Sequence, residues 1–309
     1  MALIFKNKNY SQKGLTAPFV FIVVKLLSNL LKNNYSKLLK ASLIISVYRK
    51  KEELGLVFRM LALQSSKDFE VIVADDDSGN SMEEYARESA EKYGLRMKFV
   101  THSFNGFGKN KILNKAIKSS ESDYLIFIDG DCLPHKHFIR EHLKASDENT
   151  VLCGRRVMLG DKLSDKIKIE PQLLKKGSIN YLTVVNDKIN TKVPSNYAEE
   201  SIYLGGSPFT SLINKKVTLV GCNFSLPKAL MEKINGFNED YTGPGIGEDS
   251  DIEYRLLLAG AKLHSVRNKA ILYHLFHPLT KENNNNYDYF NNVVKKEANY
   301  YCRNGLVKN

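Results

Sequence analysis

The stretch YLIFIDGDC, residues 124–132, is a short apolar run that ends in two aspartates separated by one glycine. A continuous apolar run of this length is typical of a strand that is covered on both faces of a parallel sheet. Similar runs occur at 43–48, 69–77 and 96–102. Patterns typical of helices lie between them, at 51–64, 81–93 and 109–119. Strands that alternate with helices predict βαβ units and an α/β fold with a parallel sheet.

The second half of the chain shows weaker patterns. Strands are predicted at 151–159, 217–224, 262–266 and 270–276. Helices are predicted from Pro227 onward, at 248–259 and near 288–302. Residues 161–215 are polar and mixed, and we expect mobile connections around Asn186–Pro208 within them. Residues 235–247 are rich in glycine, so we expect a loop there.

Length and composition allow a self-sufficient core. The chain has 309 residues, which suits one large α/β domain or two small ones. Because 43% of the residues are hydrophobic, the core needs neither disulfides nor metal staples. The four cysteines lie far apart and form no C-x-x-C pair, so the spacing predicts no disulfide framework and no zinc cluster. A reducing compartment fits this usage best.

The positive charge is concentrated at the N-terminus. Of the net charge of +11, residues 1–41 carry +7, with seven lysines and no acid. Residues 26–40 predict an amphipathic helix with a basic face, which either docks on the main domain or lies on an anionic membrane surface. We expect no signal peptide, and the apolar run at 17–24 is too short to span a bilayer. No basic stripe is interleaved with aromatics elsewhere, so we expect no nucleic-acid partner.

Acidic residues follow the predicted strands. Ser46 and Tyr48 end the first strand, residues 75–77 are three aspartates that end the second, and the fourth ends in Asp129-Gly130-Asp131. Ligands of open parallel sheets bind beyond the carboxyl ends of the strands, so these side chains are predicted to meet in one crevice. Up to five carboxylates in one crevice repel each other unless a cation compensates. A divalent metal, Mn²⁺ or Mg²⁺, that also neutralises a substrate diphosphate fits this pattern.

Four motifs of the first half resemble the GT-A fold of glycosyltransferase family 2, in which a mixed, mostly parallel sheet is flanked by helices. The motifs are SVY (46–48), EVIVADDDS (70–78), GKNKILNKAI (108–117) and YLIFIDGDC. The resemblance implies nucleotide-sugar binding by Ser46, Tyr48, Asp76, Lys109, Asn114, Asp129, Gly130 and Asp131. It also implies that Asp131 ligates a metal, and that Asp129 contacts the ribose or the metal. Read alone, Lys109 is also compatible with a solvated helix lysine.

The second half is similar to a subgroup related to galactosyltransferases and chondroitin polymerases. The matching stretches are GCNFSLPK (221–228), INGFNEDY (234–241), GIGEDSDIEYRL (245–256) and LYHLFHP (272–278). The resemblance implies that Asp249, beside Glu248, is the catalytic base. It implies that His274 completes the metal site, with His277 as a second choice. Acceptor-binding residues are predicted at Asn223, Gly247 and Asp251.

Two arginines and two departures from the family pattern complete the prediction. Arg155, with Arg156 beside it, is a candidate partner for the diphosphate, because arginine pairs well with phosphate oxygens. Asp77 replaces the usual glycine after the second strand, so the turn there is expected to differ. The family's usual tryptophan before the Glu-Asp pair is missing, because the chain has no tryptophan. That tryptophan commonly stacks on the sugar, so the sugar preference stays open.

The resemblance implies an inverting, metal-dependent hexosyltransferase. Its donor is a nucleotide-sugar, with UDP favoured over dTDP, and its acceptor is a carbohydrate or a lipid-linked glycan. Asp249 opens a helix, whose N-terminus favours the ionised carboxylate, and the glycines between 243 and 247 suit a closing loop. We expect a cytoplasmic enzyme of surface polysaccharide synthesis, peripheral on the inner face of the plasma membrane.

The predicted organisation has three parts, and rival functions are weaker. A basic extension (1–41) precedes the catalytic domain (42–278), which divides into a nucleotide-sugar half (42–150) and an acceptor half (151–278), and a helical tail (279–309) follows. A D-x-D phosphohydrolase carries the motif on its first strand, whereas here the motif follows the fourth. A nucleotidylyltransferase has a glycine-rich loop after the first strand, where this chain has YRKKEELG (48–55). A non-catalytic glycan-binding relative would have lost some of the acids.

Overall fold

The computed structural model describes residues 39–77, 80–103, 106–205, 207, 217–243, 248–278 and 284–308. These residues belong to one compact unit that begins at Leu39. The predicted amphipathic helix at 26–40 lies outside the described residues apart from its last two. Within the described part of the chain, no helix combines the length and the apolar character needed to cross a bilayer.

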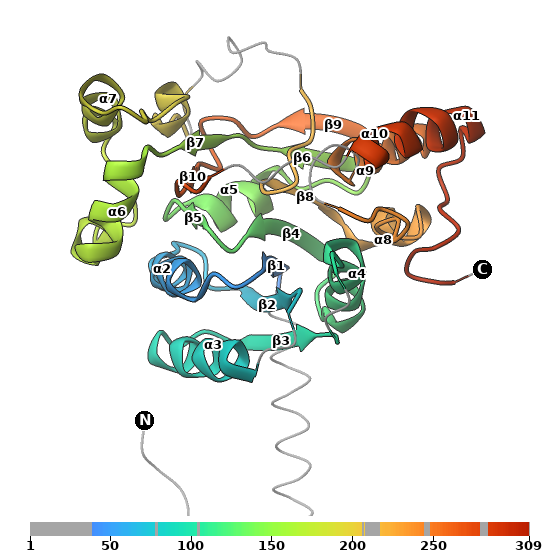
Figure 1. The fold of residues 1–309 in the computed structure, drawn as a ribbon, viewed down its shortest axis with the longest axis horizontal. Helices are drawn as coiled ribbons and strands as arrows, with labels where there is room; N and C mark the ends of the chain where they lie inside the picture. Colours follow the sequence, from blue (N-terminus) through green and yellow to red (C-terminus); the bar gives the residue numbers. More distant parts are fainter. Residues whose placement is uncertain are drawn as a thin grey trace, which may run out of the picture. The chain divides into compact units, whose positions relative to one another are not determined.

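A seven-stranded sheet forms the centre of the fold, in the order β3-β2-β1-β4-β8-β6-β9 (Figure 1). Its parallel half consists of β1 (Ala41–Val47), β2 (Phe69–Asp75), β3 (Met97–Thr101) and β4 (Tyr124–Asp129). Its other half consists of β8 (Phe224–Pro227), β6 (Thr150–Cys153) and β9 (Lys262–Ser265). β8 runs antiparallel to both β4 and β6. The mixed, mostly parallel sheet that the sequence predicts is confirmed.

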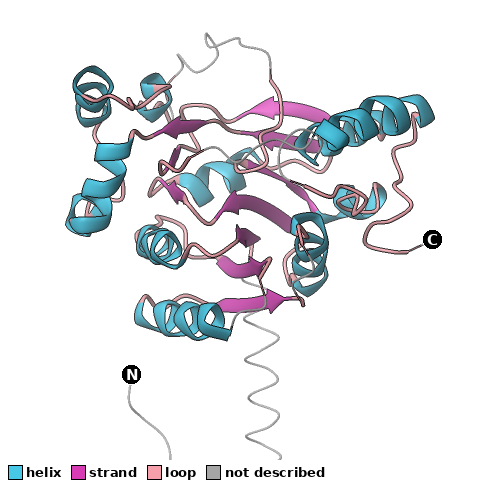
Figure 2. Ribbon diagram, viewed as in Figure 1, coloured by secondary structure: helices cyan, strands magenta, loops and turns pink. Residues whose placement is uncertain are grey.

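Helices cover both faces of this sheet, as Figure 2 shows. Leu43 and Ile45 of β1 pack in one cluster with α2 (Lys51–Ala62), α3 (Asn80–Lys92) and α5 (Phe138–Ala145). Ile44, between them, packs in a second cluster with α4 (Lys109–Ser119), α8 (Lys228–Lys233) and α9 (Glu248–Leu258). Successive side chains of a strand point to opposite faces, so an all-apolar strand must be buried on both.

A second, three-stranded sheet lies at the end of β4. β10 (Leu272–His274) pairs antiparallel with β5 (Cys132–Pro134) and parallel with β7 (Arg156–Met158). In this register His274 stands opposite Cys132. The small sheet therefore brings a histidine from the end of the chain next to the residue that follows Asp131.

Two strand predictions in the second half were wrong in detail. The predicted strand at 151–159 is two strands, because Gly154 leaves the sheet and donates its N–H to Asn223 O. The predicted strand at 217–224 begins only at Phe224, because a turn precedes it, in which Asn223 N bonds Val220 O at 2.9 Å.

The polar, mixed segment at 161–215 contains helices that the sequence pattern did not predict. They are α6 (Asp161–Ile169), η1 (Pro171–Leu174), α7 (Tyr181–Asn190) and η2 (Ala198–Ser201). The predicted tail helix is broken into α10 (Asn284–Tyr289), η4 (Phe290–Val294) and α11 (Lys295–Glu297). Mixed composition hid the helices at 161–201 because only a few positions, such as Leu163, Ile167 and Val184, face the core.

Candidate active site

A cleft of about 600 Å³ opens at the carboxyl ends of β1, β2 and β4. Ser46 and Tyr48 line it from β1 and the turn that follows, and Asp76 lines it after β2. Its remaining polar lining comes from Lys50, Lys109, Asp129, Asp131, His274 and His277. Parallel strands end at one edge of a sheet, so residues from distant parts of the sequence meet there.

Asp129 is held by two donors. Ser46 stands beside it in the β1–β4 register and donates its hydroxyl to Asp129 Oδ1 at 2.6 Å. The Nζ of Lys109, the first residue of α4, lies 3.3 Å from the same oxygen. Burial raises the pKa of Asp129, but Lys109 and the Ser46 hydroxyl outweigh it and hold the pKa below its usual value. The carboxylate is therefore ionised and ready to accept donors from a ligand.

Asp131 is almost fully buried and surrounded by basic groups. Lys50 Nζ bonds its Oδ2, and His277 Nε2 lies 3.3 Å from the same oxygen. His274 Nε2 lies 3.7 Å from Oδ1. Burial raises the pKa of Asp131, but the hydrogen bond from His277 and the charges of His274 and Lys50 hold it well below its usual range.

Asp76 is fixed from two sides. His102, just after β3, places Nε2 2.7 Å from Asp76 Oδ1, and the backbone N–H of Gly108 donates to Oδ2 at 3.0 Å. A Cβ at Gly108 would lie 2.7 Å from Asp76 Oδ1, so only glycine allows this approach. Tyr48 is 44% exposed, and the Arg49 guanidinium lies 4.9 Å from its ring centroid.

Asp249 reaches the same region from α9. Its Oδ2 accepts the N–H of Gly221 at 2.8 Å, and a Cβ at Gly221 would lie only 2.1 Å from Oδ1. Asp249, Gly221, Asp129 and Lys109 line one small pocket, which shares Ser46, Lys109 and Asp129 with the larger cleft. Burial raises the pKa of Asp249, against smaller opposing effects of Lys109 and the Gly221 N–H.

The two arginines face different ways. Arg155 donates to Thr218 Oγ1 at 2.7 Å, and it does not line the cleft. Arg156 opens β7 and donates to Cys222 Sγ at 3.1 Å. Burial raises the pKa of Asp249, and the positive charge of Arg156 acts in the opposite direction. The positive charge of Arg156 therefore acts on Asp249, and phosphate binding by Arg155 stays a prediction that its contact with Thr218 does not support.

Two predicted asparagines face the core instead. Asn114 donates to Phe237 O at 2.8 Å and to Glu239 Oε1 at 2.9 Å, and its own oxygen accepts Phe237 N–H. Asn223 is fully buried and donates to Arg155 O at 2.7 Å and Ala270 O at 3.1 Å. Both amides are used within the fold, which leaves neither of them for a ligand.

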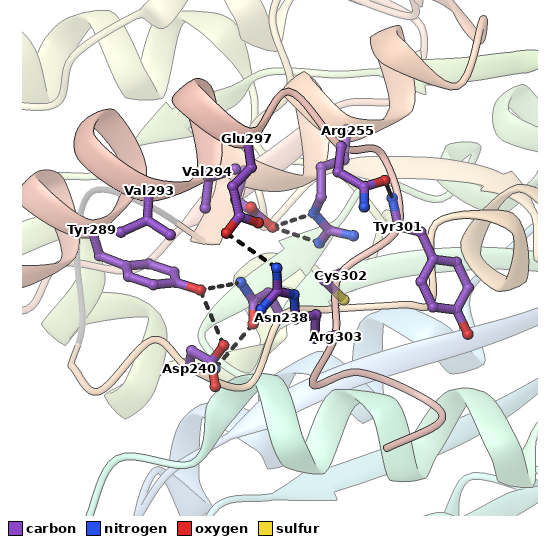
Figure 3. A pocket seen from close by; sticks show the side chains of 12 residues that line it. Asn238, Asp240, Arg255, Tyr289, Val293, Val294, Glu297, Tyr301, Cys302 and Arg303 are labelled. Atoms are coloured by element: carbon purple, nitrogen blue, oxygen red, sulfur yellow. Dashed lines mark hydrogen bonds and ion pairs between the residues drawn. The ribbon is translucent and has the colours of Figure 1, made fainter. Parts of the chain in front are cut away.

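Asp251 lies beside another pocket, of about 150 Å³, between α9 and the C-terminal segment (Figure 3). It is 1% exposed and accepts two hydrogen bonds from Arg255, from Nε at 2.8 Å and from Nη2 at 2.5 Å. Arg255 in turn donates to Ile234 O and Gly236 O. Asp251 therefore holds Arg255 within α9, and Arg255 joins the helix to the loop at 234–236. Asp251 does not line the cleft. Gly247 and the side chain of Glu248 lie outside the described residues.

The residues around Asp131 fit a divalent cation. Asp131, Cys132 and His274 each offer one ligand atom, and these atoms lie within 4.8 Å of one another. His274 Nδ1 has no hydrogen-bond partner among the described residues. A carboxylate and an imidazole that converge in this way are typical ligands of Mn²⁺ and Zn²⁺.

Sequence reasoning missed several groups of this site. Lys50 and His102 belong to no motif, because a single basic residue after a strand carries no pattern. Cys132 follows D-x-D directly, and its position after the motif was the only available signal. Asp75, one of the three aspartates predicted for the crevice, does not line the cleft. It is the last residue of β2 and 1% exposed, and neither of its oxygens has a hydrogen-bond partner within the described part of the chain. Burial raises the pKa of Asp75 to about 7.

Two protein families match the chain. Residues 42–202 match the family described as glycosyl transferase family 2, and residues 209–278 match the one described as the N-terminal domain of galactosyltransferase. Chondroitin synthase of Escherichia coli is 26% identical over 254 residues, which cover 78% of this chain and 35% of that protein. The chain thus spans about a third of the length of this relative.

Solved structures share the fold. TarS of S. aureus has a TM-score of 0.51 at 21% identity, over 78% of this chain and 37% of that one. The structure of GalNAc-T7 with UDP, GalNAc and Mn²⁺ has a TM-score of 0.54 at 12% identity, over 78% of this chain and 44% of that one. These likenesses confirm the GT-A fold that the sequence predicts.

Proposed function

The chain belongs to glycosyl transferase family 2, and on this premise we propose that it is an inverting, metal-dependent hexosyltransferase. The donor is a nucleotide-sugar, which we take to be a UDP-sugar. The acceptor is a carbohydrate or a lipid-linked glycan, and the product belongs to surface polysaccharide synthesis. The relatives named above support this choice, because one is a chondroitin synthase and another was solved with UDP, GalNAc and Mn²⁺.

One observation carries the proposal. Asp249 lines a small pocket with Asp129, and Asp131 and His274 line the larger cleft that shares Asp129 with it. A base for the acceptor hydroxyl is therefore next to the groups suited to a metal-bound diphosphate. These two tasks must meet at one anomeric carbon in a single-displacement transfer.

The cleft residues divide into a group that contacts the nucleobase and a group that contacts the phosphates. Tyr48 offers an exposed ring and Asp76 a fixed carboxylate to the nucleotide base, while Ser46 acts by holding Asp129. Lys109, Lys50 and Arg156 supply positive charge for the phosphates. Asp131 and His274, with Asp129 nearby, would hold Mn²⁺ or Mg²⁺, which would supply charge neutralisation to the leaving diphosphate.

Asp249 acts as the base. As the acceptor oxygen forms its bond to the anomeric carbon, the bond from that carbon to the diphosphate breaks, and Asp249 takes the hydroxyl proton. Burial raises the pKa of Asp249, which makes the carboxylate a better proton acceptor than a solvated aspartate. Gly221 N–H keeps one carboxylate oxygen in place, so the other is available for the acceptor. Glu248 and Gly247 remain predicted neighbours of the acceptor.

Thermal melting with a panel of nucleotides tests the donor half of this proposal. UDP, dTDP and GDP are added with and without Mn²⁺ to the wild type, to Asp131→Asn and to Asp165→Asn, an exposed control on α6. A nucleotide at 100 times its Kd stabilises the folded state by about 2.7 kcal/mol. We expect a rise with UDP that needs Mn²⁺, is lost in Asp131→Asn and persists in the control. No rise with any nucleotide contradicts the proposal.

We also propose that the enzyme works in the cytoplasm, peripheral on an anionic membrane surface. The lysine-rich extension at 1–41 supports this location, because it carries +7 without an acid. Deletion of residues 1–38 should reduce co-sedimentation with phosphatidylserine vesicles at low salt. Unchanged co-sedimentation counts against the membrane role and favours the reading in which the extension docks on the domain.

A further inference from the structure

The two oxygens of Asp131 face different chemistry. Oδ2 faces the basic groups of Lys50 and His277. Oδ1 faces His274 Nε2 at 3.7 Å and the sulfur of Cys132 at 3.6 Å. One oxygen of the carboxylate is therefore occupied by positive charge. The other, Oδ1, forms a group of three atoms with lone pairs, together with His274 Nε2 and the Cys132 sulfur.

The strand register explains why sulfur and imidazole meet. Cys132 of β5 and His274 of β10 stand directly opposite each other in an antiparallel pair. Side chains of directly opposite residues lie on the same face of the sheet, about 5 Å apart at Cβ. All three side chains are more than nine-tenths buried, and His274 Nδ1 has no partner among the described residues. The group is therefore preformed by the backbone and is not a chance meeting of surface side chains.

The distances fit a tetrahedral ion. Bonds of about 2.3 Å to sulfur, about 2.05 Å to nitrogen and about 2.1 Å to oxygen separate sulfur from oxygen by about 3.6 Å and nitrogen from oxygen by about 3.4 Å. The observed separations are 3.6 Å and 3.7 Å. An ion at the centre of the three atoms needs only small side-chain movements.

We propose that Asp131, Cys132 and His274 form a site for a thiophilic divalent ion, Zn²⁺ or Cd²⁺, that excludes the harder Mn²⁺ or Mg²⁺ and so inhibits transfer. This proposal rests on the proposed function in one respect, since the same Asp131 and His274 are taken to hold the catalytic ion. Thiolate and imidazole select Zn²⁺, whereas Mn²⁺ and Mg²⁺ favour oxygen ligands. On binding, the thiol proton leaves to solvent, and one thiolate and one carboxylate balance the charge of the ion.

A competing set of ligands is less suited to a cation. Asp129, Cys132 and Cys222 also bring one ligand atom each within 4.8 Å of one another. The guanidinium of Arg156, however, donates to Cys222 Sγ at 3.1 Å. The Cys222 sulfur is therefore already engaged by a donor, whereas Lys50 and His277 meet Asp131 on its other oxygen, Oδ2, so the Asp131 set is favoured.

Cadmium titration tests the site without any enzymatic assay. A cadmium–thiolate bond gives a charge-transfer band in the ultraviolet, and we expect one equivalent of Cd²⁺ to saturate it in the wild type. The band should vanish in Cys132→Ser and persist in Cys153→Ser, a matched control because Cys153 is also a buried strand thiol. It should persist in Cys222→Ser as well. A band that survives Cys132→Ser, or that is lost in Cys222→Ser, overturns the assignment.

X-ray absorption spectroscopy at the zinc K-edge tests the site in the wild type alone, in case Cys132→Ser does not fold. Zinc-loaded wild type should show one sulfur neighbour at about 2.3 Å, together with nitrogen and oxygen neighbours. No sulfur neighbour, or two of them, overturns the proposal. In a chelator competition, Cys132→Ser should weaken Zn²⁺ binding by at least about tenfold and leave Mn²⁺ binding unchanged.

Nucleotide melting separates failure of this proposal from failure of the proposed function. If the wild type shows an Mn²⁺-dependent rise with UDP but no cadmium band, only the thiophilic site is wrong. If the cadmium band appears and no nucleotide binds, the function is wrong and the metal site stands. With both sites present, added Zn²⁺ should abolish the Mn²⁺-dependent rise in the wild type but not in Cys132→Ser.

Discussion

The two predicted halves, residues 42–150 and 151–278, use similar polar residues for different purposes. In the half at 42–150, Ser46, Asp76 and Asp129 all line the cleft. In the half at 151–278, Asn223 is buried and donates to backbone carbonyls, and Asp251 is buried and holds Arg255, which bonds a neighbouring loop. Asp249 lies only two residues from Asp251 on α9, yet it reaches the pocket beside Asp129.

The difference follows from how each half is built. Four parallel strands end at one edge of the sheet, so polar residues at or just after their ends, such as Ser46, Asp76 and Asp129, can face the cleft. The second half contributes short strands in both directions, joined by turns as well as by helices. Its polar residues must satisfy buried backbone groups in those turns, and this task competes with ligand binding.

Replacing Asp249 gives the largest effect that this comparison predicts. Asp249→Asn removes the proposed base and keeps the shape of the side chain. We expect kcat to fall about 10³-fold, while the Mn²⁺-dependent melting rise with UDP persists, because the metal and nucleotide groups are untouched. Steady-state kinetics and melting on the same preparation check both parts. Loss of UDP binding together with activity would mean that Asp249 belongs to the donor site.

Asp251→Asn tests whether its neighbour is structural. Removing one partner of a buried ion pair costs about 3–5 kcal/mol, because Arg255 keeps an uncompensated charge. Denaturant unfolding should show this loss of stability, whereas kcat per folded molecule stays near that of the wild type. A stable protein without activity would instead indicate that Asp251 binds the acceptor. Asp249 and Asp251 would then both serve the reaction.

A pair of arginine variants sharpens the comparison at β7. Arg156→Gln removes a charge that faces Asp129 and Asp249, so UDP-sugar affinity should fall by about 2 kcal/mol, or about 30-fold. Arg155→Gln serves as the matched control, since its guanidinium bonds Thr218 away from the cleft. Calorimetric titration of UDP with Mn²⁺ compares the two. Equal losses would show that both arginines reach the phosphates.

The smallest effect concerns Asp75 and the pH dependence of stability. Burial raises the pKa of Asp75 to about 7 in the folded protein, whereas the unfolded value is about 4. Between these values the folded state binds the proton that the unfolded state has lost, so Asp75 lowers stability as pH rises from about 4 to about 7. Asp75→Asn should therefore raise Tm by roughly 5 °C at pH 8 and change it little at pH 4. A rise of the same size at both pH values would refute this titration.

The fold was largely predictable because its signal is long and periodic. The predicted strand bounds, at 43–48, 69–77 and 124–129, agree within about two residues with those of β1, β2 and β4. Apolar runs that alternate with helical patterns fit only a parallel sheet covered by helices. The second half was less predictable. Gly154 and the turn at Asn223 shift its strands, and a hydrogen bond between distant backbone groups leaves no local pattern in the sequence.

The cleft was predictable where a strand end determines it, as for Asp129 and Asp131. The choice between Arg155 and Arg156 was not predictable, because neighbouring side chains of a strand point to opposite faces. An error of one residue in the strand position exchanges the two faces. Lys50 and His102 were missed for another reason. Their roles depend on which carboxylate stands opposite in space, and Asp131 and Asp76 are far from them in the sequence.

The position of β10 sets the time at which the enzyme can first work. Asp129 and Asp131 leave the ribosome early. His274 lies on β10, which pairs with β5 and β7 and is synthesised near the end of the domain. At about 5–20 residues per second, the growing chain carries its aspartates without their histidine for on the order of ten seconds. A nascent chain is therefore unable to assemble the proposed metal ligands until synthesis of the domain is almost finished.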